Sequence, residues 1–157
     1  MKSKLLILVF TVVAALGSAT AQTRDLFTAA RSNDVNLAKS LLDAKANVNQ
    51  QDDKGYTPLI LATYNDNFEV ANLLLKHGAN IEAKDHSGRT ALMGAAFKGN
   101  EREVKLLLDN GANASAADSK GLTSMMYAVM FGRISVIQVL RAGENARSTT
   151  TQVSTTK

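Results

Sequence analysis

Short landmarks recur along this chain at intervals of 33 residues, and that spacing constrains the fold more than any other feature. One shift of 33 residues superposes several sets of identical residues: Gly55, Gly88 and Gly121; Asp52, Asp85 and Asp118; Asn47, Asn80 and Asn113; Ala29, Ala62, Ala95 and Ala128. A repeat of this length is one supersecondary unit, which cannot bury its apolar face alone. The chain is therefore predicted to stack four such units into a solenoid.

Local signals within each unit predict two helices and a projecting loop. Threonine precedes a stretch of apolar residues with helical spacing in three units, where its hydroxyl can cap free N–H groups: Thr57, Thr90 and Thr123. Pro58 suits the first position of such a helix. Gly78 and Gly111 are predicted to end second helices at positive φ. Gly55, Gly88 and Gly121 mark turn tips between units, each with an aspartate three residues earlier that is placed to accept backbone N–H bonds.

Two segments carry a family resemblance. Residues 52–59 (DDKGYTPL) and 73–80 (LLLKHGAN) closely resemble the signature of ankyrin repeats, whose period is about 33 residues. The resemblance covers residues 24–147 and implies an all-α repeat solenoid with β-hairpin-like loops. It places an ankyrin-repeat domain at 22–147, with repeats at about 24–54, 55–87, 88–120 and 121–147.

The two end repeats depart from the pattern. Lys45 stands where the next two repeats have glycine, so the second helix of repeat 1 is predicted to end less sharply. In repeat 4, Gly143 lies one residue early, which predicts a one-residue deletion in the second helix. The Thr- and Ser-rich residues 148–157 bury little and are predicted to form a mobile tail.

The first 21 residues have the order of an export signal. Lys2 and Lys4 precede an apolar run at 5–16, and the small residues 19–21 (ATA) follow. A membrane anchor is the alternative, but the run is shorter than the ~20 residues that span a bilayer. We expect cleavage after Ala21, a periplasmic or secreted protein, and no membrane insertion after the signal is removed.

Composition and motifs disfavour an enzyme or a nucleic-acid binder. The chain has no cysteine, which excludes disulfides, thiolate nucleophiles and Cys-ligated zinc. Its formal charge of +4 falls to +2 without Lys2 and Lys4, and the signs are interspersed. Its only histidines, His77 and His86, are interpreted as exposed polar residues. The sequence therefore predicts no catalysis, no cofactor, no metal and no nucleic-acid partner.

The resemblance also implies a groove for a protein partner, formed by the turns and the first helices. Carried over position by position, its turn residues are Asp53, Lys54, Tyr56, His86, Ser87, Arg89, Ser119, Lys120 and Leu122. Its first-helix residues are Arg31, Ser32, Tyr64, Asn65, Phe97, Lys98, Met130 and Phe131. Aromatic and Arg side chains are typical binding hot spots, so Tyr64 and Phe97 are candidate anchors. Alternatively, these two rings only cover the ends of their helices.

Two functions follow as expectations. The first is a non-enzymatic protein-interaction scaffold, similar to small exported single-domain ankyrin-repeat proteins of bacterial envelopes; a link to envelope or oxidative-stress defence is compatible with that resemblance. The second is a structural module that forms a homodimer through repeat 4, whose residues 125–140 are rich in apolar side chains for a terminal repeat. The sequence does not name the partner.

Overall fold

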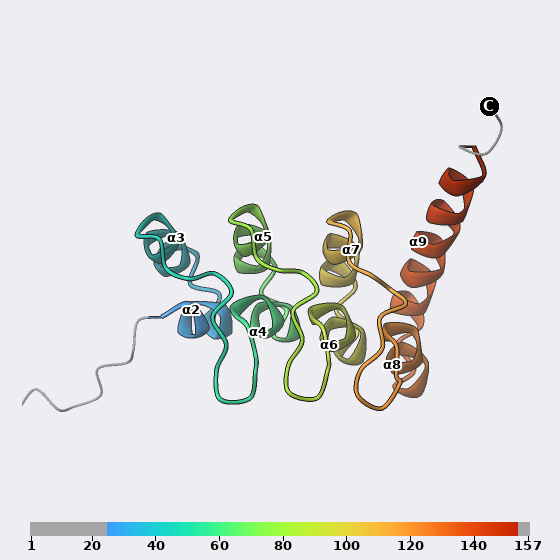
Figure 1. Ribbon diagram of the computed structural model, residues 1–157, viewed down its shortest axis with the longest axis horizontal. Coiled ribbons are helices and arrows are strands. Elements are labelled where there is room, and N and C mark those ends of the chain that lie inside the picture. Colours follow the sequence, from blue (N-terminus) through green and yellow to red (C-terminus); the bar gives the residue numbers. More distant parts are fainter. Residues whose placement is uncertain (1–24, 154–157) are drawn as a thin grey trace, which may run out of the picture.

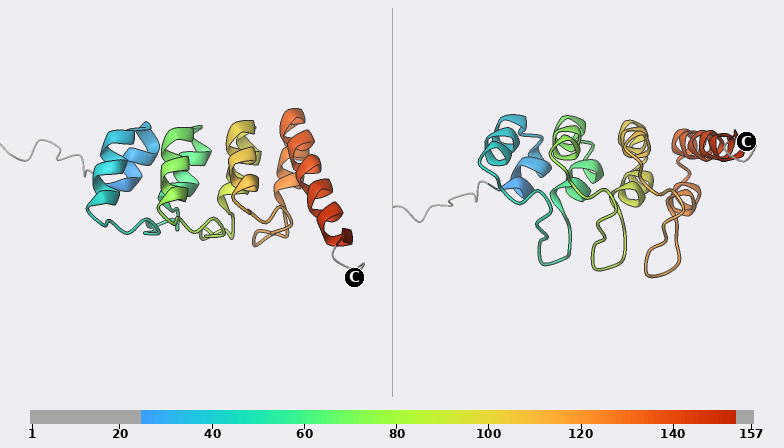
Figure 2. Two further views of the ribbon diagram at one scale, coloured as in Figure 1. Left: turned by 90° about the horizontal axis from the view of Figure 1, so that it is seen from above. Right: turned by 45° about the horizontal axis from the view of Figure 1, so that its top comes forward.

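The computed structural model describes residues 25–153, with side-chain surroundings described as far as Glu144. These residues form four helix pairs, and a loop projects between successive pairs (Figure 1): α2 (Leu26–Ser32) with α3 (Val35–Asp43), α4 (Pro58–Tyr64) with α5 (Phe68–Lys76), α6 (Ala91–Lys98) with α7 (Glu101–Asp109), and α8 (Ser124–Met130) with α9 (Ile134–Val153). The pairs stack in a row, with all loops on one side (Figure 2). The predicted all-α repeat solenoid is confirmed.

Side-chain caps start the first helix of every repeat. Thr57 Oγ1 accepts a hydrogen bond from the N–H of Ile60 at 3.2 Å, and Pro58 follows as the first residue of α4. Thr90 and Thr123 cap α6 and α8 in the same way. In repeat 1, the Asp25 side chain caps α2 by accepting a hydrogen bond from the N–H of Thr28. The predicted helix starts are therefore confirmed, and each cap satisfies a backbone donor that the helix itself cannot.

Alanine at one position of each first helix lets the helices pack closely. Four equivalent alanines are fully buried: Ala29, Ala62, Ala95 and Ala128. Around them lies a continuous core of larger residues from all four repeats, including Leu26, Leu59, Leu74, Leu92, Leu107 and Leu140. Because this core runs from repeat to repeat, each unit depends on its neighbours for burial.

A polar side chain near the start of each later second helix reaches back to the preceding repeat. The three bonds go to backbone carbonyls of the preceding first helices: Asn67 Nδ2 to Ala30 at 2.7 Å, Asn100 Nδ2 to Thr63 at 2.8 Å, and Arg133 Nε to Phe97 at 3.0 Å. Each bond satisfies an acceptor near a helix end, where intrahelical donors run out. These bonds fix the spacing between neighbouring helix pairs.

Glycine at the turn tips lets neighbouring loops touch through their backbones. Gly55 has φ +77°, and a Cβ there would lie 2.8 Å from the backbone nitrogen of His86. That nitrogen donates to the carbonyl of Lys54 at 3.1 Å. The next pair of loops repeats the contact, with Ser119 donating to Ser87 at 3.0 Å beside Gly88. Any larger residue at these glycines would separate the loops.

The second helices of repeats 1 to 3 end alike. Gly78 and Gly111 have φ +82° and +91°, as predicted. Lys45 takes the same left-handed conformation with φ +64°, and Ala46 then donates to the carbonyl of Leu41 at 3.0 Å. The prediction of a looser end in repeat 1 is therefore wrong. The closing hydrogen bond recurs in all three repeats and holds even a lysine at an unfavourable φ.

Repeat 4 differs more than the sequence predicts. The helix α9 does not end near Gly143 but continues to Val153. Gly143 instead faces α7, where a Cβ would lie 3.3 Å from Leu108 Cδ1. Residues 148–153 thus continue α9, and the mobility expected for 148–157 stays a prediction.

The expected signal peptide, residues 1–21, and residues 154–157 lie outside the described residues. Among the helices of residues 25–153, none is long and apolar enough to cross a membrane.

Substitutions at the helix ends test the repeat register. We expect Gly111→Val to lower the free energy of unfolding by more than about 1 kcal/mol, because a β-branched residue at positive φ is strained. Lys45→Gly should raise it by up to about 1 kcal/mol, because it removes the strain that the lysine bears. Urea unfolding of both variants checks this pair. Unchanged stability of Gly111→Val would contradict the register.

One core position of repeat 3 holds a carboxyl group. Glu103 in α7 is fully buried, and the equivalent residues, Val70 and Val136, are buried valines. Neither carboxyl oxygen has a well-formed hydrogen bond among the described residues, and the carboxyl groups of Glu103 and Asp66 lie close enough to interact. Burial, together with the nearby Asp66 carboxyl, raises the pKa of Glu103 to about 7. The protonated form is therefore favoured in the fold, because a buried charge without partners is costly.

This carboxyl should make stability fall with rising pH. In the folded protein the pKa of Glu103 is about 7, above the usual 4.5, so folding favours the protonated carboxyl. The contribution of this protonation to the free energy of unfolding is complete below pH 4.5 and is lost as the pH rises through 7. We expect Glu103→Val to remove this loss and to raise the free energy of unfolding at pH 7.5 by about 2–3 kcal/mol. Urea unfolding at pH 4.5 and 7.5 measures it. Glu101→Gln, at an exposed site in the same helix turn, is the control and should keep the wild-type profile.

Candidate functional site

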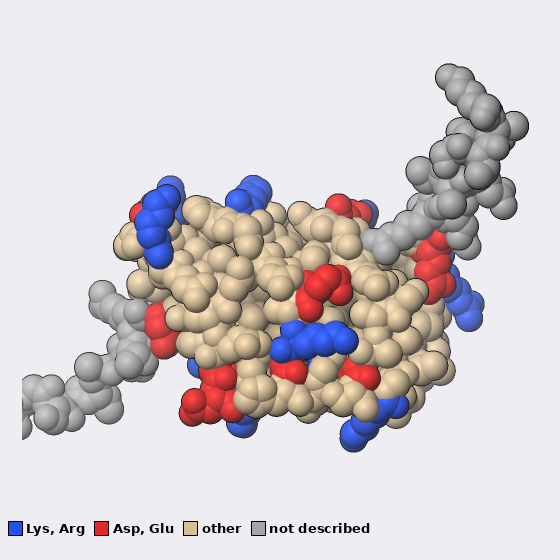
Figure 3. All heavy atoms as spheres, in the orientation of Figure 1, with Lys and Arg blue, Asp and Glu red and all other residues tan. Residues whose placement is uncertain are grey.

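Charges of both signs are mixed on the drawn face of the molecule (Figure 3). On the face drawn in Figure 3, Lys and Arg lie among Asp and Glu, with no broad area of one sign. His77 and His86 are both exposed. Within residues 25–153, no group of three or more His, Asp or Glu is placed to hold a metal ion.

A pocket of about 300 Å³ lies where the first helices of repeats 2 to 4 meet the loops before them. Its lining is mostly apolar and aromatic: Tyr56, Ile60, Leu61, Tyr64, Asn65, Asp85, Arg89, Thr90, Met93, Gly94, Phe97 and Tyr127. All three tyrosines of the chain are among these residues. An apolar hollow with a few polar groups is the usual form of a ligand site.

The aromatic rings form a connected row along the first helices. Tyr64 and Phe97 stack with ring centroids 6.1 Å apart and planes 9° from parallel. Phe97 also meets Phe131 edge to face at 4.5 Å and Tyr127 at 6.4 Å. Contacts of these kinds stabilise ring pairs beyond the burial of their area. The row is therefore a fixed wall rather than a set of independent side chains.

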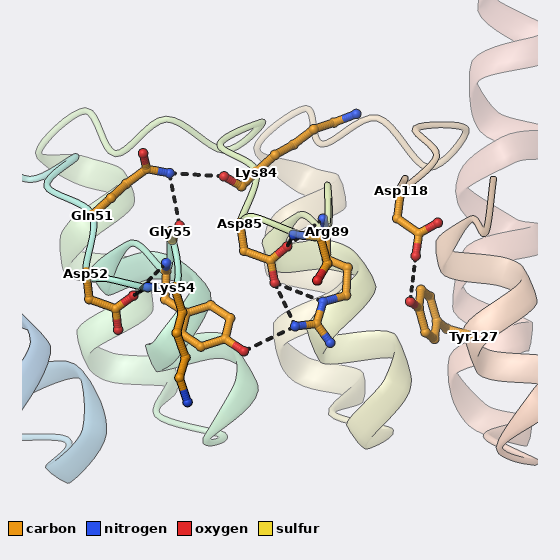
Figure 4. A network of polar contacts seen from close by, with 11 residues as sticks. Gln51, Asp52, Lys54, Gly55, Lys84, Asp85, Arg89, Asp118 and Tyr127 are labelled. Atoms are coloured by element: carbon orange, nitrogen blue, oxygen red, sulfur yellow. Dashed lines mark hydrogen bonds and ion pairs between the residues drawn. The ribbon is translucent and has the colours of Figure 1, made fainter. Parts of the chain in front are cut away.

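An aspartate organises each loop and supplies a polar wall. Asp85 Oδ1 accepts the backbone N–H groups of Ser87 at 2.8 Å and Arg89 at 2.9 Å. Its Oδ2 pairs with the Arg89 guanidinium at 2.8 Å, and Arg89 donates onward to the Tyr56 hydroxyl at 3.1 Å (Figure 4). Burial alone would lower the pKa of Arg89, but these partners raise it. Arg89 is thus a fixed cation in the pocket wall.

The equivalent aspartates use the second oxygen differently. Asp118 Oδ2 accepts the Tyr127 hydroxyl at 2.7 Å, whereas Asp52 Oδ2 meets Arg31 at 3.4 Å. Burial and the bond to Asp118 raise the pKa of Tyr127 to about 12. Burial of Asp118 by itself would raise the pKa of its carboxyl. The hydrogen bonds that this carboxyl accepts outweigh burial and lower the pKa. Each aspartate accepts two backbone N–H groups of its own loop, so the structural role predicted for all three is confirmed.

Side chains also join one loop to the next. Gln51 and Lys84 occupy equivalent positions and lie between neighbouring loops (Figure 4). Gln51 Nε2 donates to the carbonyl of Lys84 at 3.0 Å, and Lys84 Nζ donates to that of Ala117 at 3.0 Å. The loops therefore form one connected edge beside the pocket.

The structure brings together five of the residues proposed for binding. Tyr56, Tyr64, Asn65, Arg89 and Phe97 line the pocket. Two others adjoin this group: Lys98 Nζ lies 5.0 Å from the Tyr64 ring centroid, and Phe131 packs on Phe97. The remaining ten lie outside the lining. Asp53, Lys54, His86, Ser87, Ser119 and Lys120 are exposed in the loops, Leu122 is half-buried, and Arg31, Ser32 and Met130 are exposed at the ends of α2 and α8.

Sequence reasoning missed seven lining residues: Ile60, Leu61, Asp85, Thr90, Met93, Gly94 and Tyr127. Gly94 and Tyr127 are equivalent positions of neighbouring repeats, and Leu61 is their counterpart in repeat 2. A departure from the repeat pattern could have revealed this position in the sequence, because it has a large side chain in repeats 2 and 4 and no side chain in repeat 3.

Comparison with known families agrees with this architecture. The family model described as ankyrin repeats (3 copies) matches residues 19–85 and again residues 82–151. A search of curated proteins finds no significant match. The matches cover well over half of the chain and include every helix pair described above, and the chain belongs to the ankyrin-repeat family.

Proposed function

We propose that this protein is a non-enzymatic scaffold that binds a protein partner in the groove between its loops and first helices. Ankyrin repeats are generally protein-interaction modules. The observation that carries the proposal for this chain is the pocket in that groove, with four aromatic rings and Arg89 in its lining. Tyr and Arg in such hollows are the side chains that most often dominate binding energy.

The rigidity of the groove supports this proposal. The loops are joined by backbone bonds, and Asp85 and Asp118 hold the side chains of Arg89 and Tyr127 in place. A partner therefore meets side chains whose positions are already fixed, so little ordering entropy remains to be lost on binding.

The proposal includes an exported compartment. It rests on the order of basic, apolar and small residues within 1–21. We propose the cell envelope as the place to search for the partner, with oxidative-stress defence as one candidate setting that the resemblance to small exported ankyrin-repeat proteins suggests.

Capture of a partner from an envelope fraction by the purified chain tests the groove. We expect Tyr64→Ala to cost about 2 kcal/mol of binding energy, or roughly thirtyfold in affinity, because the ring lines the pocket. Tyr64 suits this test since it is 39% exposed, whereas Phe97 contacts three other rings and its removal would also destabilise the fold.

The matched control is Val35→Ala, on α3 and outside the pocket, where the side chain is 37% exposed. It should retain full capture, measured by the affinity of the captured protein for each variant. Equal affinity for Tyr64→Ala and the wild type, with both folded, would reject the groove as the binding site.

A second function, self-association, is favoured by one observation. Most of the exposed large hydrophobic residues among those described lie in repeat 4: Met126, Val129, Met130, Phe131 and Ile134. A second copy of the chain could cover this end of the stack, which would otherwise face water. The apolar end shares Phe131 with the aromatic row but contains none of the residues that line the pocket, so both functions can coexist.

Light scattering measures this directly. If repeat 4 is a dimer contact, the purified chain should have twice the monomer mass, and Met130→Glu with Ile134→Glu should give a monomer. These side chains are 62% and 64% exposed, so the charges should cost little stability in the isolated chain. A monomer at all concentrations of the wild-type chain would exclude this function.

A further inference from the structure

Repeat 3 has a glycine in the middle of a helix, at a position that is large in its neighbours. Gly94 lies within α6, whereas the equivalent residues are Leu61 in α4 and Tyr127 in α8. Glycine weakens the interior of a helix relative to any residue with a side chain except proline. Its presence here therefore calls for a reason outside helix formation.

Neither backbone conformation nor packing supplies that reason. Gly94 is absent from the glycines with positive φ in the described chain. A Cβ built on Gly94 would meet only Tyr64 Cδ2, at an ordinary contact distance of 3.6 Å. An alanine would fit without displacing a neighbour. Gly94 instead leaves a space between two larger side chains. Leu61 and Tyr127 occupy the equivalent positions in the neighbouring repeats, and all three residues line the pocket.

The walls of this space define the guest that it can take. Tyr64 and Phe97 provide ring faces and edges, and Met93, whose side chain is fully buried, belongs to the same lining. Rings of this kind could also hold a cation. Here, however, Arg89 is in the wall and Lys98 Nζ lies 5.0 Å from the Tyr64 ring centroid, while the Asp85 carboxylate already pairs with Arg89. A cationic guest would meet two like charges.

We propose that the pocket over Gly94 receives one uncharged aromatic side chain of the protein partner, and that the missing side chain at Gly94 determines this specificity. The volume of about 300 Å³ lies at the lower end for ligand pockets and suits a single large side chain. The inference rests on the proposed groove function and adds the chemistry of the residue that the partner inserts.

Methyl NMR of the full chain labelled at methionine tests this without the partner. The probe is N-acetylphenylalaninamide, compared with tetramethylammonium chloride at the same concentrations. Met93 lines the pocket, and Met126 in α8 is exposed outside it and serves as the internal control. We expect the aromatic probe to shift the Met93 methyl resonance saturably, with the Met126 resonance unchanged, and tetramethylammonium to bind more weakly.

Two variants assign the effect to Gly94. Gly94→Leu introduces the residue that repeat 2 has at this position and should abolish the saturable shift. Gly94→Ala should raise the melting temperature, because alanine favours the helix, and should weaken probe binding roughly threefold by occupying part of the space. The alanine variant keeps the test valid if the leucine variant does not fold.

Three results would overturn the inference: no saturable shift of Met93 in the wild type, equal probe affinity in the folded Gly94 variants, or tighter binding of tetramethylammonium than of the aromatic amide. The proposed function fails separately, if Tyr64→Ala leaves partner capture unchanged. A partner that binds the groove equally well in wild type and Gly94→Leu would refute only the specificity assigned to the pocket.

Discussion

The backbone contact between neighbouring loops is the constraint on which the rest of this structure depends. The N–H of His86 bonds to Lys54, and that of Ser119 bonds to Ser87, each beside a glycine whose Cβ would collide with the next loop. These contacts require the same loop at the same interval in each repeat. The 33-residue period is therefore a physical requirement of stacking, since a one-residue change in the loop would move the donor away from its acceptor and remove the bond.

That register also places the pocket. Equivalent positions of successive first helices lie side by side, so Leu61, Gly94 and Tyr127 share one row beside a second row that contains Tyr64 and Phe97. A hollow arises wherever one repeat has a small residue between two large ones. The aspartate of each loop then fixes a polar group at the edge of the row, through Arg89 in one repeat and Tyr127 in the next. The periodic backbone thus determines the fold, and the side chains that depart from the period determine the shape and chemistry of the pocket.

The sequence predicts the periodic part well because one physical cause acts at every repeat. Caps such as Thr57, the buried alanines and the positive φ of Gly111 all follow from the helix and turn pattern. Tyr64, Phe97 and Arg89 were also found, since the family pattern locates the groove. The end of α9 was missed because Gly143 does not stop the helix. The left-handed conformation of Lys45 was missed because the closing hydrogen bond from Ala46 to Leu41 forms there as it does in the next two repeats. The raised pKa of Glu103 and the space beside Gly94 depend on the residues that surround them in the fold, and the spacing of residues along the sequence does not reveal these neighbours.

The central claim is that a partner binds over the aromatic pocket, and fluorine NMR tests it most directly. The chain has three tyrosines, all of them in the pocket lining, so fluorotyrosine labelling reports on this site alone. Unlabelled partner, captured from the envelope fraction and added to the labelled chain, should shift or broaden the resonances of all three tyrosines. Binding that light scattering detects while all three resonances stay unchanged would contradict the account.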